Sequence, residues 1–278
     1  MGSPDTVEEL EIRLFLEAVR VRYGYDLRGY ARPAMRRRLH AVLARHSIPH
    51  MGELQHRALT DAYFFAEIVE GLTVQVSEMF RFPPFYRAFR TKVVPILRTY
   101  PQLKIWHAGC ANGEEAYATA IMLREEGLYD RAQIYATDVS VDALERARAG
   151  VYSADKAALF EQNYRDAGGT GDFSDYYTAA YDRIAAKNFL QKNILFFQHN
   201  LVSDHVFGEM HVVFCRNVMI YFGADLRKEV LSKFVESLCP GGFLCLGNSE
   251  RIQRTLLETE FSEFAATERI YRRQRGHA

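Results

Sequence analysis

The sequence predicts an α/β protein in which a doubly wound, mostly parallel sheet follows a helical domain and is interrupted by a small antiparallel β-subdomain. Three observations predict this arrangement. Residues 7 to about 70 show apolar residues at helical spacing and no strand pattern. From Leu103 onward, short apolar strands alternate with helices, which is typical of parallel sheets with crossover connections. Residues from about 152 to 193 break that alternation with Gly168-Gly169-Thr170-Gly171 and many tyrosines.

The composition is that of an ordinary globular protein. The 278 residues include 35 Lys+Arg and 35 Asp+Glu, so the formal net charge is zero, and 48% of the residues are hydrophobic. Zero net charge argues against a general nucleic-acid binder. No apolar run of about 18 residues occurs and no signal-peptide pattern begins the chain, so we expect a cytoplasmic protein without membrane insertion. We also expect a monomer, although no sequence pattern determines the oligomeric state.

The cysteines and histidines do not indicate a metal site. Cys110, Cys215, Cys239 and Cys245 form no Cys-x-x-Cys pair, and each lies in or beside an apolar stretch. They either bind a metal or are buried, reduced thiols, and the second interpretation is the expected one. The nine histidines form no His-x-His or His-x-x-x-His pair within a helix or strand. We therefore expect no bound metal.

The predicted domain boundaries follow these changes in pattern. Residues 1–72 form the helical domain, residues 73–101 a linker that includes Pro83-Pro84, and residues 102–278 the sheet domain, with the β-subdomain inserted at about 155–193. In the helical domain, Pro33 suits the first turn of a helix. The apolar residues at helical spacing are Leu10, Leu14, Leu16 and Val19 in one helix and Met35, Leu39, Val42 and Leu43 in the next.

Strands and helices can be placed one by one in the sheet domain. Strands are expected at 103–109, 133–137, 194–197, 211–215 and 243–246, and helices at 114–126, 141–149 and 225–238, with a turn at 240–242. Trp106, in the first strand, is expected in the core.

Two features at the ends of neighbouring strands indicate a nucleotide site. Gly109-Cys-Ala-Asn-Gly113 lies between the first strand and its helix, where glycines allow a ligand to approach the backbone. Asp138 ends the second strand and can accept hydrogen bonds from a ribose diol. Each feature has an ordinary alternative, since the glycines can make a simple tight turn and Asp138 can cap the following helix.

The residues around the glycine turn favour one kind of nucleotide. The spacing is Gly-x-x-x-Gly rather than the Gly-x-Gly-x-x-Gly of dinucleotide sites, and Glu114-Glu115 follow where a phosphate would lie. Two carboxylates repel pyrophosphate and attract the ammonium and sulfonium groups of S-adenosylmethionine. The pattern therefore predicts a methyltransferase.

Several motifs resemble those of the CheR-type chemotaxis receptor methyltransferases. They are Ala-Gly-Cys-Ala-Asn-Gly-Glu-Glu-Ala-Tyr (108–117), Ala-Thr-Asp (136–138), Asn200-Leu201, Phe-Cys-Arg-Asn-Val-Met-Ile-Tyr-Phe (214–222) and Gly-Asn-Ser-Glu (247–250). The resemblance runs from about residue 10 to 273. It implies a Rossmann-like class I S-adenosylmethionine-dependent methyltransferase domain, with S-adenosylhomocysteine as product. It also implies methyl transfer to glutamates on the cytoplasmic helices of methyl-accepting chemotaxis proteins.

The resemblance also implies roles for single residues. The positions that match cofactor-site positions are Gln75, Ser77, Arg81, Gly109, Glu114 or Glu115, Asp138, Asn200, Leu201, Arg216 and Asn217. Tyr221 matches a tyrosine near the transferring methyl group, and Arg81 is the second candidate catalytic residue. The 73–81 segment departs from the family's usual Thr-Asn-Glu-Thr-x-Phe-Phe-Arg, with Gln75 in place of asparagine, Val76 of glutamate and Met79 of phenylalanine. Asn248 stands where the family often has histidine, and the inserted subdomain differs in detail, which puts docking of a receptor tether peptide in doubt.

A basic stretch is the candidate docking surface. From Leu27 to Gly52 there is no Asp or Glu, while Arg28, Arg32, Arg36, Arg37, Arg38 and Arg45 lie there. With an acidic receptor helix as partner, Arg32, Arg36, Arg37, Arg38 and Arg45 are expected to steer docking. The alternative is a solvated basic helix or a nucleic-acid patch. The aromatic residues of the insertion line a peptide groove or fill a core, and the sequence leaves both open.

Two other functions compete with receptor methylation. One is a module that binds the methyl donor or its product and regulates a signalling array without turnover, which the unusual 73–79 segment suggests. The other is a methyltransferase for a small molecule or nucleic acid. No Asn/Asp-Pro-Pro-Tyr motif follows the 211–215 strand, which counts against methylation of DNA bases.

Overall fold

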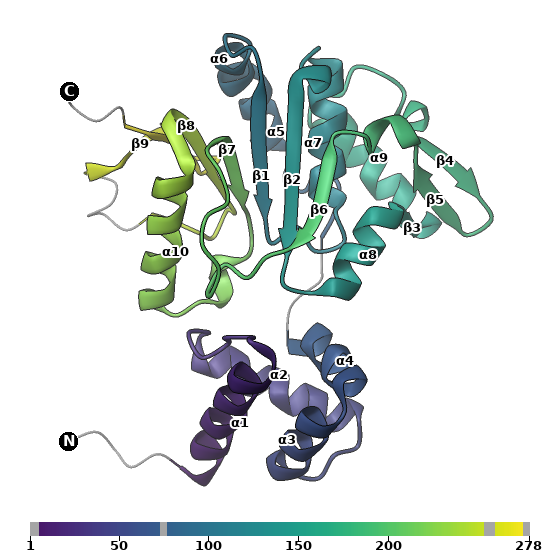
Figure 1. Cartoon of the computed structure of the whole chain (residues 1–278). Helices are drawn as coiled ribbons and strands as arrows, with labels where there is room; N and C mark the ends of the chain where they lie inside the picture. The colour runs from purple at the N-terminus through teal and green to yellow at the C-terminus, as the bar shows by residue number, and fades with distance from the viewer. Residues whose placement is uncertain (1–5, 73–76, 253–258, 275–278) are drawn as a thin grey trace. The chain divides into compact units, whose positions relative to one another are not determined.

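The chain forms two compact units, each with its own hydrophobic core (Figure 1). The computed structural model describes residues 6–72, 77–252 and 259–274. The first unit, Met1–Val74, also includes Asn200–His205 and Tyr221–Val230. The second unit comprises Gln75–His199, Val206–Ile220 and Leu231–Ala278. The sequence placed all residues after 101 in one domain, whereas two short segments of that range belong to the helical unit.

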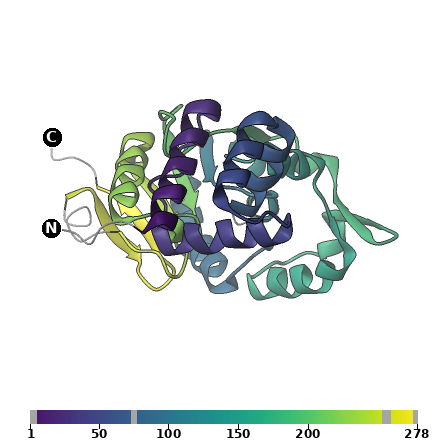
Figure 2. The same ribbon diagram turned by 90° about the horizontal axis from the view of Figure 1, so that it is seen from below.

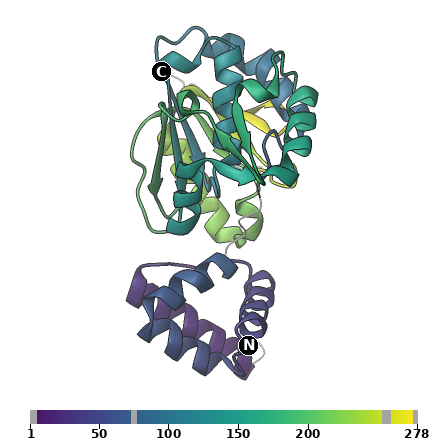
Figure 3. The same cartoon turned by 90° about the vertical axis from the view of Figure 1, so that its right-hand side faces the viewer.

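Over its described N-terminal residues, the first unit consists of the helices α1 (Val7–Tyr23), α2 (Arg32–Arg45), α3 (Met51–Thr60) and α4 (Ala62–Leu72), seen together in Figure 3. Pro33 lies in the first turn of α2, as predicted, because that position needs no N–H donor. The predicted apolar stripe of α1 is partly wrong. Phe15 and Val19, four residues apart, are buried, and this rotation leaves Leu10 and Leu14 exposed at 41% and 53%.

Backbone pairing ties the segment Tyr221–Val230 to the helical unit. The Ala31 N–H donates to the Tyr221 carbonyl at 2.8 Å, and the Gly223 N–H donates to the Gly29 carbonyl at 2.7 Å. A β-bridge joins Tyr30 to Phe222, whose rings meet edge to face.

The second unit contains the predicted doubly wound sheet. Its spatial order is β6 (Ile194–Gln198), β2 (Ala132–Asp138), β1 (Leu103–Ala108), β7 (Met210–Cys215), β8 (Leu238–Leu246), β10 (Ile270–Arg273) and β9 (Phe261–Ala265). The strands from β6 to β8 are parallel, and β10 is antiparallel to both of its neighbours. The order reverses between β1 and β7, which is where ligands bind in folds of this type.

Helices cover both faces of this sheet, so Trp106 and His107, successive residues of β1 that point to opposite faces, are both buried. Trp106 contacts Phe234 of α10 (Ala224–Ser237) on one face, with its ring centroid 5.5 Å away. His107 points to the other face and stacks on Phe214, which also contacts Phe85. The helices that follow β1 and β2 are α7 (Glu114–Glu125) and α8 (Val141–Ala149).

The region predicted as a linker is mostly helical. Pro83 and Pro84 begin α5 (Pro83–Ala88), which continues through a π-helical turn at Phe89–Val93 into α6 (Val94–Leu97). Proline suits the first helical turn, so the Pro-Pro pair starts a helix instead of extending a linker.

The insertion is a small antiparallel sheet, as predicted, with its strands in the order β3 (Val151–Ser153), β5 (Arg183–Ala186) and β4 (Tyr177–Ala180). It begins at β3, a few residues before the predicted boundary, and includes α9 (Ala157–Asp166). Figure 2 shows the β4–β5 hairpin projecting from the end of the large unit. Several of its aromatic residues are buried and fill the core: Tyr152, Phe160, Tyr164, Phe173, Tyr176 and Tyr177.

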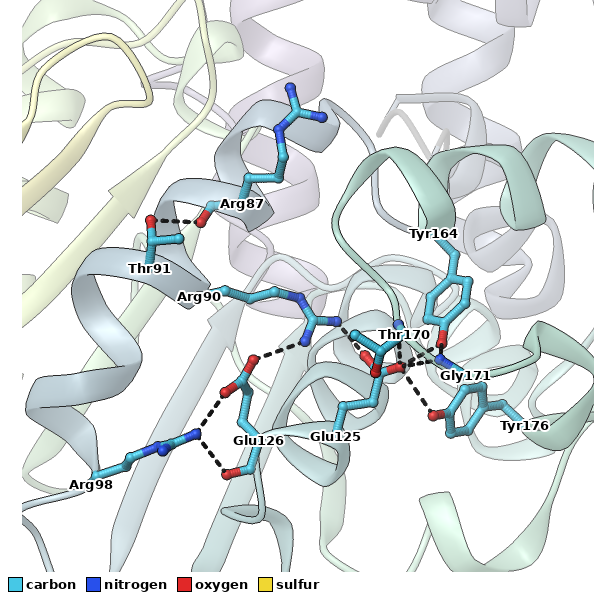
Figure 4. Close-up of polar contacts among 10 residues, drawn as sticks. All are labelled: Arg87, Arg90, Thr91, Arg98, Glu125, Glu126, Tyr164, Thr170, Gly171 and Tyr176. Atoms are coloured by element: carbon cyan, nitrogen blue, oxygen red, sulfur yellow. Dashed lines mark hydrogen bonds and ion pairs between the residues drawn. The ribbon is translucent and has the colours of Figure 1, made fainter.

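One carboxylate anchors the insertion to the sheet domain (Figure 4). Glu125, at the end of α7, accepts hydrogen bonds from the hydroxyls of Tyr164 and Tyr176 and from the backbone N–H groups of Thr170 and Gly171. It also pairs with the guanidinium of Arg90, whose side chain is 9% exposed. A single buried group therefore joins α7, the helix after α5 and the glycine loop of the insertion.

The structure differs from the sequence prediction in two respects near the C-terminus. The turn predicted at 240–242 is wrong, because Pro240, Gly241 and Gly242 lie within β8. Gly241 has a φ of 84° and the pairing of β7 with β8 shifts register near Met210, so the glycine bends the strand without ending it. The strands β9 and β10 were not predicted.

Candidate functional site

The glycine turn closes over the end of β2. The N–H groups of Gly109 and Cys110 both donate to the Thr137 carbonyl at 2.8 Å. Gly109 and Gly113 have φ values of 81° and 86°, which glycine adopts without strain. A Cβ at Gly109 would lie 2.6 Å from Val218, and one at Gly113 would lie 2.9 Å from Ala147. Both glycines therefore allow close packing of neighbouring protein segments.

Asp138 ties the glycine turn to the second strand. Its carboxylate accepts from the Ala111 N–H at 2.9 Å through Oδ2 and from the Ser140 N–H at 3.0 Å through Oδ1. The helix cap of α8 is Ser140, whose hydroxyl accepts from the Ala143 N–H, so Asp138 is not that cap. The side chain is buried at the carboxyl edge of the sheet, where a ligand would bind.

Glu114 is a buried carboxylate without hydrogen-bond partners among the described residues. It is 1% exposed, and neither carboxylate oxygen is hydrogen-bonded. The nearest cation is the ammonium of Lys156, 3.9 Å from Oε1. Burial raises the pKa of Glu114 to about 7, although its own backbone N–H, the charge of Lys156 and the nearby Ser77 hydroxyl oppose this. A buried carboxylate that accepts no hydrogen bond, and whose ion pair is as long as 3.9 Å, is suited to binding a further cationic group.

Glu115 points in a different direction and is already paired. It accepts from the Arg216 guanidinium at 2.6 Å and contacts His107 Nδ1 at 3.2 Å. Burial would raise its pKa, but the charges of Arg216 and His107 bring the pKa below its ordinary value. The sequence left open which of Glu114 and Glu115 meets a cofactor, and only Glu114 has unpaired oxygens.

Arg216 joins the sheet to the segment before α5. Its second nitrogen donates to the Arg81 carbonyl at 3.1 Å, and its guanidinium lies 4.1 Å from the centre of the Phe85 ring. Ser77 and Arg81 are partly buried in this segment. Gln75, the remaining predicted residue of the segment, lies outside the described residues.

A carboxylate that the sequence did not single out holds the loop after β7. Glu250 is 5% exposed and accepts from the N–H groups of Asn217 at 2.8 Å, Gly247 at 2.6 Å and Ile220 at 3.1 Å. A Cβ at Gly247 would lie 2.7 Å from Glu250 Oε2. The Gly-Asn-Ser-Glu motif was the available signal, since the glycine and the acid three residues later act together.

Three predicted site residues belong to the helical unit. Asn200 and Leu201 follow β6, and the Asn200 side chain accepts from the Val202 N–H at 2.9 Å. Tyr221 is partly buried, and the guanidinium of Arg38 lies 4.1 Å from the centre of its ring.

The predicted docking arginines divide into two groups. Arg32, Arg36, Arg37 and Arg45 are exposed on α2. The docking role predicted for Arg38 is wrong, because it is 7% exposed, donates to the Leu72 carbonyl and stacks on Tyr221. A cavity of about 790 Å³ runs along α1 and α2. Its lining includes apolar residues such as Ile12 and Met35, one acidic residue, Glu9, and the basic side chains of Arg13, Arg28, Arg32, Arg36, Arg37 and His40.

The cysteines are buried thiols. All four are unpaired and buried, and burial raises the pKa of Cys110 and Cys215 well above the ordinary value. Within the described ranges, no group of three or more His, Cys, Asp or Glu side chains is arranged to hold a metal ion. In the same ranges, none of the helices has the length and apolar character needed to cross a membrane.

Comparison with known proteins identifies the family of both units. Residues 75–270 match the model described as CheR methyltransferase, SAM binding domain, and residues 10–73 match CheR methyltransferase, all-alpha domain. A protein named putative methyltransferase Cher3 from Pseudomonas putida is 44% identical, covering 95% of this chain and 97% of that relative. A chemotaxis protein methyltransferase from Listeria monocytogenes is 30% identical over 88% of this chain and 91% of the relative.

These matches agree with the geometry. The sheet order is that of a doubly wound nucleotide-binding fold, and the turn at its edge presents an unpaired carboxylate instead of phosphate-binding groups. The matched models together cover almost the whole chain. The chain therefore belongs to the CheR methyltransferase family and contains both its all-alpha domain and its S-adenosylmethionine-binding domain.

Proposed function

We propose that this protein transfers a methyl group from S-adenosylmethionine to the side-chain carboxylate of glutamates on the cytoplasmic helices of chemoreceptors. The product is a glutamyl methyl ester, and the protein acts as a cytoplasmic monomer. Family membership supports methyl transfer with this donor, and relatives named chemotaxis protein methyltransferases support a role in chemotaxis. The observation that carries the proposal is the buried carboxylate of Glu114 beside the glycine turn, whose oxygens lack hydrogen-bond partners among the described residues and lie 3.9 Å or more from the Lys156 ammonium.

The residues at the carboxyl edge of the sheet fit the donor. We expect Glu114 to bind its ammonium group, since both oxygens lack partners, and Asp138 to face the ribose. The Gly109 backbone, Ser77, Arg81 and Asn217 complete the proposed site in the large unit, and the cofactor contacts that the resemblance implies for Asn200 and Leu201 stay predictions. Glu114 and Asp138 would repel a pyrophosphate, which argues against a dinucleotide.

The acceptor needs no general base. A free glutamate has a pKa of about 4.3, so it is already a nucleophilic anion at pH 7. S-adenosylmethionine, when bound, supplies an electrophilic methyl group on a sulfonium centre. The residues of the chain therefore act by orientation, which can contribute roughly 7–11 kcal/mol. We assign this role to Arg81, whose positive charge attracts and orients the acceptor carboxylate, and the catalytic role that the resemblance implies for Tyr221 stays a prediction.

Charge complementarity supports docking of an acidic helix on α2. Arg32, Arg36, Arg37 and Arg45 are exposed, and the first three also line the cavity along α1 and α2. Arg38 is buried against Tyr221, so we expect it to orient this tyrosine and not to meet the receptor directly.

Transfer of a radiolabelled methyl group tests the proposal. The purified chain is incubated with labelled donor and chemoreceptor cytoplasmic fragments, and the labelled receptor is treated with mild base. A methyl ester releases labelled methanol, whereas N-methyl groups are stable. Donor binding without transfer to any receptor would favour a regulatory module, and transfer to small molecules alone would also refute the proposal.

A further inference from the structure

Both terminal nitrogens of the buried Arg216 guanidinium are hydrogen-bonded to protein groups, whereas its Nε has no partner among the described residues. Its side chain is 2% exposed, one nitrogen donates to Glu115 at 2.6 Å, and the other donates to the Arg81 carbonyl at 3.1 Å. The flat face of the guanidinium lies over Phe85, 4.1 Å from the ring centre. Arginine suits this place because its planar fork reaches two acceptors at once and stacks on an aromatic ring.

Glu115 is the centre of this arrangement. One oxygen accepts from Arg216 and the other contacts His107 Nδ1 at 3.2 Å, so both oxygens are used inside the protein. His107 is held by stacking on Phe214, with ring centroids 4.4 Å apart. Three elements, β1, α7 and the end of β7, are thus joined by one buried network that ends on the Arg81 carbonyl.

The segment that receives this hydrogen bond has an unusual backbone. Phe80 and Phe82 have φ values of 52° and 61°, in the left-handed region that bulky residues avoid. Such conformations are strained and persist only where the surroundings enforce them.

Contacts at two places in the segment hold this conformation. On the Phe80 side, the ring packs against Tyr86 and Tyr164, and the Met79 carbonyl accepts from Asn163 at 3.1 Å. Between the two strained residues, the Arg81 carbonyl is held by Arg216.

We propose that Arg216 and Glu115 are a positioning pair, which binds the Arg81 carbonyl and thereby fixes the strained Phe80–Phe82 segment so that the Arg81 side chain is presented to the donor site. This inference rests on the proposed function, because it assumes that Arg81 contacts the donor. It reassigns Glu115 and Arg216 from cofactor ligands to groups that act through Arg81. Glu114, the preceding residue at the start of α7, remains the residue proposed to bind the ammonium group of the donor.

A double-mutant cycle tests the pair by calorimetric binding of S-adenosylhomocysteine to the full chain. Arg216→Lys keeps a positive charge facing Glu115 but loses the fork that also reaches the Arg81 carbonyl. We expect it to weaken binding about tenfold, and Arg81→Ala to weaken binding by a similar or larger factor. If Arg216 acts through Arg81, then R216K adds no further loss in the R81A background. A role in folding alone would not produce this coupling.

Two further variants keep the test decisive. Arg131→Lys is the matched control, because the Arg131 guanidinium also donates to two backbone carbonyls, those of Tyr100 at 2.8 Å and Arg98 at 3.0 Å. It should bind like the wild type. Glu115→Gln should repeat the R216K effect, with urea unfolding verifying that each variant is folded.

Each outcome has a defined meaning. Additive losses for R216K and R81A, or wild-type binding by R216K, would overturn the positioning role while leaving the proposed function intact. Failure of the wild-type chain to bind S-adenosylhomocysteine would refute the proposed donor site, and this inference with it. Normal binding by R81A but weaker binding by R216K would show that Arg216 acts without Arg81, which also overturns the inference.

Discussion

At the scale of single residues, Glu114 links stability to pH. Burial raises its pKa to about 7 from 4.5, so between these pH values the folded state keeps a proton that the unfolded state releases. Stability therefore falls as pH rises through this window and levels off above pH 7. The loss amounts to about 3 kcal/mol. Glu114→Gln removes the titrating group, so we expect it to be more stable than the wild type at pH 8, by an amount that shrinks toward pH 5.

Urea unfolding at a series of pH values measures this difference. Glu145→Gln, an exposed position on α8, is the control and should unfold with the wild-type pH profile. The stabilised E114Q chain should bind S-adenosylhomocysteine at least about tenfold more weakly, because the amide has no charge to offer an ammonium group. Parallel pH profiles for E114Q and the wild type would contradict the assignment.

Sequence patterns predicted which residues gather at the site better than they predicted what each does. The glycine turn and Asp138 meet as expected, since both follow neighbouring parallel strands. Neighbouring Glu114 and Glu115 could not be separated, because only side-chain direction places one in an ion pair and leaves the other unpaired. Arg38 looked like its exposed neighbours, and only the packing of α2 shows that it is buried.

At the scale of elements, Glu125 determines how firmly the insertion is held. It is the common acceptor for Arg90, two tyrosine hydroxyls and two backbone N–H groups (Figure 4). Glu125→Ala removes one of the two carboxylates that pair with Arg90, which keeps Glu126 at 3.0 Å. It also leaves the Tyr164 hydroxyl without its acceptor, and an unsatisfied buried group costs roughly 1–3 kcal/mol. We expect a loss of that size in urea unfolding, with faster hydrogen exchange at Thr170 and Gly171.

The control for this variant is Glu161→Ala. Glu161 forms an exposed pair with Arg165 within α9, and exposed pairs contribute roughly 0–1 kcal/mol. Equal losses of stability for E125A and E161A would mean that Glu125 is not the anchor.

Element prediction succeeded where periodicity is local and failed where pairing is distant. The strands and helices from 103 to 149 follow the sequence pattern closely, because each buried strand is followed by a strongly patterned helix. The strands β9 and β10 depend on pairing with β8, and their short runs carry little signal of their own. The glycines at 241 and 242 suggested a turn, but β8 bends there and continues.

At the scale of the whole molecule, the proposed function assigns binding of the donor to one unit and docking of the receptor to the other. The large unit has the donor site, while α2 of the helical unit has the exposed basic surface. The chain is neutral overall, so the basic stretch from Leu27 to Gly52 creates a positive potential only locally. We do not expect the whole molecule to attract anions. Recognition of the receptor and binding of the donor should therefore be separable by mutation.

Charge reversal on α2 tests this separation. Arg36→Glu combined with Arg37→Glu should raise the KM for the receptor at least about tenfold, since repulsion replaces attraction at two exposed positions. The affinity for S-adenosylhomocysteine should not change. The wild-type KM should rise with ionic strength, and that of R36E/R37E should depend on it less, because salt screens exposed charges over about 8–10 Å. The matched control reverses two exposed charges of the large unit, Arg183→Glu and Lys192→Glu, and should leave both constants unchanged. A receptor KM that changes equally in the two double variants would place docking away from α2.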